Sequence, residues 1–206
     1  MRDEDADADR LADAALAMPT IPQPWLEAVY GHYPRNVWSD TPAHAETPET
    51  KRLREAQRRA REDRSHLIAL MEAIEAEAPG TDVMDLSYLT YDACYVVRAN
   101  ADPVTETTTR VREVVACISV IAPVYAIYQA TTEVATSGEQ DVTTADTPDA
   151  DVAPLWGVVA RQVERIFGYT RMEPEIGLAT IPDVQVQNVP LGEATVYDAL
   201  FTPTRK

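Results

Sequence analysis

The sequence predicts an α+β fold, in which an antiparallel sheet of about four to six strands carries two main helices packed against one face. Three observations predict it. Apolar residues recur at helical spacing in two segments, 48–78 and 154–167. Between them lie runs rich in Val, Ile and Tyr, which are typical of strands. These runs follow one another with short links, which favours antiparallel pairing over a parallel sheet.

The N-terminal segment is rich in Asp, Ala and Pro, so we expect residues 1–24 to form an acidic, flexible arm. One domain is then expected to span residues 25–206, since this length suits a single core. It opens with an aromatic segment that contains Trp25, Tyr30, Tyr33 and Trp38. We expect these rings to pack the segment on the body of the protein, and a ligand-binding strip is the alternative.

Thr47 and Pro48 predict a helix start, because a hydroxyl caps the first turn and proline suits the first helical position. We expect one helix from about Pro48 to Ala78. Its first half holds a basic run, since residues 50–67 contain seven Lys and Arg against three acids. Arg and Glu residues four apart are neighbours on a helix surface, so the run is predicted to be a solvated helix face.

Two strands are predicted first, at Val83–Leu89 and Cys94–Ala99. The longest apolar tract follows and contains Pro123, which would break a helix. We therefore expect two further strands, at about 112–121 and 124–133, with one long bent strand as the alternative. The first of the two is apolar on both faces, which predicts a central position.

Residues 136–152 contain five carboxylates and no base, and we expect an acidic loop there. A second helix is predicted at about Pro154–Phe167, with Gly168 as its stop signal. Beyond it, Asp183–Val189 alternates Val and Gln as a half-exposed strand would. The last segment, 192–202, is ambiguous between a short strand and a turn of helix.

The charge balance is strongly acidic, with 34 Asp and Glu against 18 Lys and Arg and a net charge of −16. Such a charge repels nucleic acid and acidic membranes and favours a basic partner, although a high-salt or high-GC proteome would give the same bias. The two cysteines lie in strand-like runs and are predicted to be buried free thiols. No signal peptide and no membrane span are expected, which predicts a cytoplasmic protein.

Motifs for catalysis are scarce. The chain has no glycine-rich phosphate loop and no nucleophile elbow, and His44-Ala-Glu46 lacks the cysteine partner of a zinc deaminase site. We therefore expect no cofactor and no metal site. An enzyme that uses paired carboxylates stays an alternative, with Asp85 and Asp92 beside Tyr88 and Tyr91 as its cleft.

The C-terminal part carries four short segments in a fixed order: Phe167-Gly168-Tyr169, Pro174-Glu175, Pro182-Asp183-Val184 and Gly192-Glu193-Ala194-Thr195. In this order they resemble the end of a group of bacterial toxin-immunity proteins, over about a quarter of the chain. The resemblance implies that the protein neutralises a toxin of the same or a neighbouring cell, without a cofactor. The alternative is that each segment only marks the boundary of a structural element.

These observations predict a cytoplasmic inhibitor, an immunity protein that binds a toxin directly. Carboxylates would speed its association with a basic toxin, and aromatic rings would anchor the contact. The alternatives are a scaffold component of a larger assembly and the carboxylate enzyme. We expect partner contacts from residues in loops and at strand ends, namely Asp85, Tyr88, Asp92, Glu139, Asp141 and Asp146.

Overall fold

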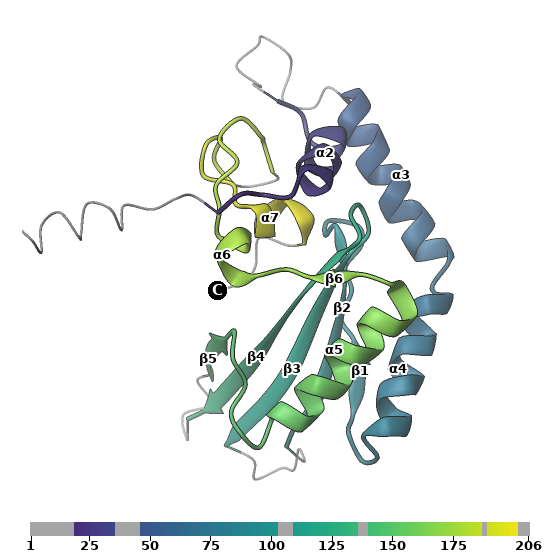
Figure 1. Cartoon of the computed structure of the whole chain (residues 1–206), viewed down its shortest axis with the longest axis vertical. Helices are drawn as coiled ribbons and strands as arrows, with labels where there is room; N and C mark the ends of the chain where they lie inside the picture. Colours follow the sequence, from purple (N-terminus) through teal and green to yellow (C-terminus); the bar gives the residue numbers. More distant parts are fainter. Residues whose placement is uncertain (1–18, 36–45, 103–108, 136–139, 187–188, 202–206) are drawn as a thin grey trace, which may run out of the picture.

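A computed structural model describes residues 19–35, 46–102, 109–135, 140–186 and 189–201. It confirms the α+β class (Figure 1). The strands are β1 (Val83–Asp85), β2 (Cys94–Asn100), β3 (Arg110–Ser119), β4 (Val124–Val134), β5 (Gln140–Ala145) and β6 (Thr170–Arg171). The helices are α2 (Gln23–His32), α3 (Pro48–Glu62), α4 (Ser65–Glu77), α5 (Ala153–Phe167), α6 (Pro174–Gly177) and α7 (Val196–Leu200).

The sheet follows the chain in the order β1-β2-β3-β4-β5, with every neighbouring pair antiparallel, and the short β6 pairs with β4 in parallel. The strand β3 is central, and its last seven residues are buried, as its apolar character on both faces predicted. Residues 120–123 separate β3 from β4, so the prediction of two strands around Pro123 is confirmed.

Two helices, α4 and α5, cover one face of the sheet, as predicted (Figure 1). Leu70 and Ile74 of α4 and Val159 and Val163 of α5 are fully buried there. They share one core with the side chains that the strands direct to this face: Tyr95, Val97, Ala99, Val114, Ala116, Ile118, Tyr125 and Ile127. The alternation along each strand places every second residue in this layer.

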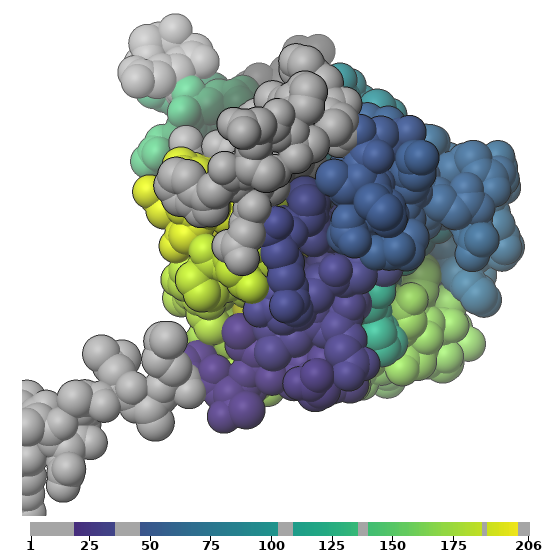
Figure 2. Space-filling model, turned by 90° about the horizontal axis from the view of Figure 1, so that it is seen from above, coloured from purple at the N-terminus to yellow at the C-terminus, as the bar shows by residue number. Residues whose placement is uncertain are grey.

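The opposite face is covered by segments from both ends of the chain. Trp25 and Val29 of α2 pack there with Tyr197 and Leu200 of α7, over the other side chains of β2, β3 and β4. Figure 2 shows α2 in purple between the C-terminal segment and α3. The aromatic segment thus packs on the body, as predicted, through Trp25 and Tyr33. Both cysteines, Cys94 and Cys117, are buried free thiols in this layer, as predicted.

The prediction of one helix over Pro48–Ala78 is wrong, because the chain bends between α3 and α4. Asp63 has extended backbone angles, and its carboxylate accepts hydrogen bonds from the Ser65 amide at 3.1 Å and the Ser65 hydroxyl at 2.7 Å. Such a local side-chain bond competes with the helical pattern and starts a new turn. The bend lets α4 lie on the sheet while α3 packs against α2.

Three further boundaries differ from the prediction, and the ambiguous tail takes one of its two predicted forms. The segment 136–152 is not a loop throughout, because it contains the exposed strand β5. The first strand ends at Asp85 instead of Leu89, since Asp85 accepts a hydrogen bond from the Ser87 amide and turns the chain. Among the described residues of Asp183–Val189, only Val184 forms a bridge, although Val184 and Val186 are both buried. The ambiguous tail forms α7, which a capping box between Thr195 and Asp198 starts.

Candidate protein-binding surface

The connection between β1 and β2 presents three large apolar side chains to solvent. Leu86 is 45% exposed, Tyr88 60% and Tyr91 55%. The two tyrosine rings contact each other, with centroids 5.0 Å apart and planes tilted by 36°. Exposed aromatic residues that adjoin one another are typical of sites that bind other proteins. We call these three residues the aromatic patch.

Hydrogen bonds within the connection fix the backbone that carries the patch. The amides of Tyr91 and Asp92 both donate to the Tyr88 carbonyl at 3.0 Å. The Ser87 amide donates to Asp85 at 2.8 Å, and the Ser87 hydroxyl accepts from the Val96 amide of β2 at 3.0 Å. A loop that is ordered in this way would lose little conformational entropy if a partner bound it.

The basic run of the sequence supports this loop from outside. Arg61 donates to the Leu89 carbonyl at 2.9 Å, and Arg64 forms an ion pair with Asp85. Gln57, which is buried in α3, donates to the Asp92 carbonyl at 3.1 Å. Two arginines of the basic run, Arg61 and Arg64, thus hold the loop of the aromatic patch in place. The ion pair also gives Asp85 an arginine as its partner.

The rest of the run is neutralised on the helix surface, as predicted. Arg58 pairs with both Glu55 and Glu62, and Arg59 pairs with Glu55 at 2.8 Å. Hydrogen bonds from Arg58 and Arg59 lower the pKa of Glu55 to about 2. These pairs are exposed, so each contributes little to stability. They leave α3 a solvated face, in agreement with its predicted role.

The six predicted contact residues do not gather in one place. Asp85, Tyr88 and Asp92 lie at the β1 edge of the sheet, whereas Asp141 lies in β5 at the opposite edge and Asp146 follows that strand. Glu139 lies outside the described residues. Four strand spacings of about 4.8 Å separate the two edges, or roughly 19 Å. The structure therefore holds two candidate surfaces instead of one. Leu86 and Tyr91, which complete the aromatic patch, were not among the six predicted contact residues.

Comparisons of this chain with protein-family models, curated proteins and solved structures return no match. Among the described residues, no group of three or more His, Cys, Asp or Glu is placed to hold a metal ion. No helix in the described part of the chain is long and apolar enough to cross a bilayer.

The carboxylates that follow β5 are partly neutralised by one arginine of β3. Arg112 binds both oxygens of Asp102, at 2.7 and 2.9 Å, and donates to Asp151 at 2.8 Å. Asp149 lies 3.6 Å from the same guanidinium and also bonds the buried Gln129 through its amide and its carboxylate. Asp149 and Asp151, which the sequence placed in an acidic loop, therefore fasten the segment before α5 to the sheet.

Replacement of this arginine gives the first prediction. We expect Arg112→Gln to lower the free energy of unfolding by about 2 kcal/mol at pH 7, because charge-assisted hydrogen bonds to Asp102 and Asp151 and the ion pair with Asp149 are lost. Those bonds hold the pKa of Asp102 below its usual value. The stabilisation from Asp102 is complete above the unfolded pKa, about 3.9, and is lost as pH falls through the lower folded value.

The measurement is urea denaturation of the wild type and the Arg112→Gln variant between pH 7 and pH 2. The difference between their free energies of unfolding should shrink below about pH 4. Arg110→Gln is the control, since this exposed arginine of the same strand makes one pair at 3.8 Å. It should cost less than about 0.5 kcal/mol. If the difference in the free energy of unfolding between the wild type and the Arg112 variant did not change with pH, the stabilisation could not come from the bonds between Arg112 and Asp102.

Proposed function

We propose that the protein is a cytoplasmic, immunity-type inhibitor that binds a basic toxin directly and neutralises it. The observation that carries the proposal is the aromatic patch, in which Leu86, Tyr88 and Tyr91 are exposed on a loop fixed by its own hydrogen bonds and by Arg61. Exposed tyrosines on an ordered loop supply contact area at low entropic cost, which is what a tight inhibitor needs.

Two features of the sequence support the choice of partner. The net charge of −16 favours association with a basic protein. The order of short segments from Phe167 to Thr195 resembles toxin-immunity proteins. In the structure these segments lie at the end of α5, at the start of α6, at the bridge of Val184 and at the cap of α7. They thus position the C-terminal layer of the core, while the aromatic patch lies outside the resemblance.

Coexpression tests the proposal. The chain is produced together with the product of a toxin-like gene that adjoins its own, and cell growth and copurification are measured. We expect relief of toxicity and a stoichiometric complex. The control replaces this chain by its Arg112→Gln variant, which keeps the aromatic patch and should still neutralise the toxin at a temperature where it is folded.

Two results would contradict the proposal. One is the absence of a complex, with toxicity unchanged, when both proteins are soluble. The other is self-assembly of the purified chain into large oligomers, measured by sedimentation, because this behaviour belongs to the scaffold alternative. An inhibitor is expected to stay in small species until its toxin is added.

A further inference from the structure

The strand β5 forms an open edge of the sheet. Among the described residues it pairs only with β4, and all six of its residues are exposed. The opposite edge is less accessible, since β1 has only three residues, is partly buried and lies against α4. An exposed edge strand presents unpaired amides and carbonyls, to which another extended chain can add.

The register of the sheet shows which backbone groups of β5 face outward. The Val134 amide donates to Thr109, on the β3 side of β4, whereas the Tyr125 carbonyl accepts from Met172, on the β6 side. Odd-numbered residues of β4 therefore direct their backbone groups toward β5, and Glu133 and Asp141 form a hydrogen-bonded pair. In β5 the alternation leaves the amides and carbonyls of Gln140, Val142 and Thr144 facing outward.

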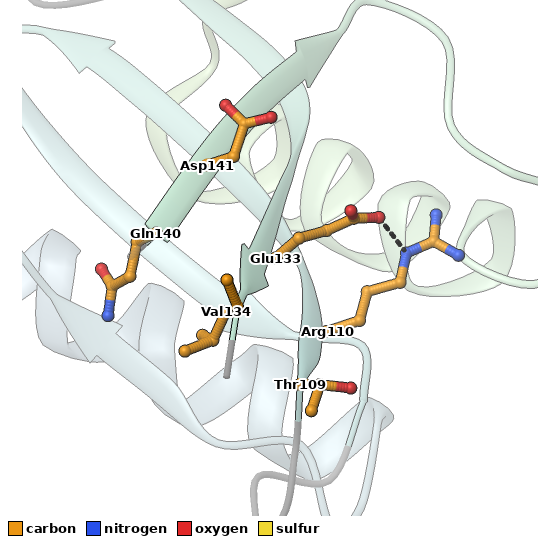
Figure 3. A pocket seen from close by; sticks show the side chains of 7 residues that line it. Thr109, Arg110, Glu133, Val134, Gln140 and Asp141 are labelled. Carbon is orange, nitrogen blue, oxygen red and sulfur yellow. Dashed lines mark ion pairs between the residues drawn. The ribbon is translucent and has the colours of Figure 1, made fainter. Parts of the chain in front are cut away.

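Side-chain charges run across the sheet toward this edge. Arg110 of β3, Glu133 of β4 and Asp141 of β5 are directly opposite one another and share a face (Figure 3). Arg110 lies 3.8 Å from Glu133, and no described cation lies within ion-pair distance of Asp141. Like charges directly opposite each other destabilise a sheet. A cation on the far side of Asp141 would relieve this repulsion.

We propose that β5 is a docking edge for an extended basic segment of a partner protein, which adds as an antiparallel strand and places an Arg or Lys opposite Asp141. Asp141 and this residue would form a non-hydrogen-bonded pair, in which side chains are closest. An open depression of about 670 Å³ lies beside the start of β5 (Figure 3). It is lined by Thr109, Arg110, Glu133, Val134, Ala135, Gln140 and Asp141. This inference does not rest on the proposed function, since the aromatic patch lies at the other edge.

A second copy of the chain is a poorer occupant than a basic segment. Two molecules that each carry a net charge of −16 repel each other. Self-pairing would also bring two copies of Asp141 to the new interface without an added cation. Charge complementarity therefore favours a different, basic chain.

The probe is a synthetic peptide, acetyl-Thr-Val-Thr-Arg-Thr-Val-Thr-amide, whose β-branched residues favour an extended chain. It is titrated into the full chain labelled with ¹⁵N, at low salt. We expect saturable shifts of the amides of Gln140, Val142 and Thr144, with a dissociation constant on the order of 0.1–1 mM. Replacement of the peptide arginine by Glu should weaken binding by roughly fivefold or more.

Two methylated peptides test whether the backbone pairs as proposed. With the peptide arginine opposite Asp141, the two flanking threonines direct their N–H groups to β5 and the arginine N–H faces solvent. Methylation of the threonine nitrogens should therefore abolish the shifts, whereas methylation of the arginine nitrogen should leave them. Equal binding of both peptides would overturn strand addition.

Variants of the chain test the same edge from the other side. Val142→Pro removes one outward N–H and should abolish binding, while Val142→Thr keeps that N–H and should not change it. Asp141→Asn leaves the backbone intact and should weaken binding roughly fivefold. This variant tests the proposal independently, in case the proline at position 142 disturbs the strand itself. No saturable shift up to about 2 mM peptide would overturn the proposal. Concentration-dependent dimerisation of the unbound chain through the same amides would overturn the choice of occupant.

Discussion

Tyr88→Ala is expected to weaken the complex with the toxin about 30-fold, which corresponds to about 2 kcal/mol at a contact centre. The ring is 60% exposed in the isolated chain and would be buried by the partner. Truncation removes its contact area and its packing against Tyr91. The measurement is calorimetric titration with an inactivated toxin. Since the ring is exposed, the free energy of unfolding should change by less than about 0.5 kcal/mol.

Two control variants make this result specific. Tyr88→Phe keeps the ring and should retain most of the affinity. Leu178→Ala removes the most exposed large apolar side chain among the described residues, which lies just after α6, and should have no effect. If the Leu178 variant weakened binding as much as the Tyr88 variant, the contact would lie on the C-terminal layer and the aromatic patch would not be the site.

Leu70→Ala should lower the free energy of unfolding by about 3 kcal/mol, because it leaves a cavity between α4 and the sheet. Leu70 is fully buried in the core that α4 and α5 share with β2 and β3. Ile68, two residues earlier on the same helix, is 55% exposed. Ile68→Ala should therefore cost less than about 0.5 kcal/mol. Urea denaturation of the two variants measures the difference.

This matched pair tests the orientation of α4 on the sheet as well as the packing. A similar loss of stability in both variants would show that α4 is rotated from the orientation described. Both residues lie in the same helix, and the helix propensities of Leu and Ile differ by roughly a few tenths of a kcal/mol, so this difference contributes little.

Local patterns were sufficient to predict most of the fold. The spacing of apolar residues located α5 to within a residue, and Gly168 ends it with a positive φ of 68°. Pro123 and the β-branched residues around it correctly separated β3 from β4. These features depend on the periodicity of apolar residues and on single residues with distinctive backbone conformations, and both can be recognised in a single sequence.

Features that depend on side-chain bonds or on pairing partners could not be predicted. The end of α3 is set by Asp63 and Ser65, and nothing in the apolar stripe marks it. The strand β5 has no apolar face of its own, since it is held by the ladder with β4. Composition alone indicated a loop there, because exposed strands bury too little to leave a pattern.

Only part of the candidate surfaces could be predicted from the sequence, for a similar reason. Tyr88 was selected for its place near a strand end, and the structure exposes its ring. The contacts that fix its loop come from Arg61 and Arg64, more than 20 residues earlier, and side chains that far apart show no pattern in the sequence. The outward amides of β5 could be identified only once the register with β4 was known.

The layer that α2 and α7 form over the sheet has a consequence for biosynthesis. Until the ribosome has made the segment that ends in Leu200 and Phe201, the face that carries Cys94 and Cys117 lacks part of its cover. Nascent or prematurely terminated chains would thus expose apolar surface and a pair of thiols, which invites aggregation and recognition by chaperones and proteases.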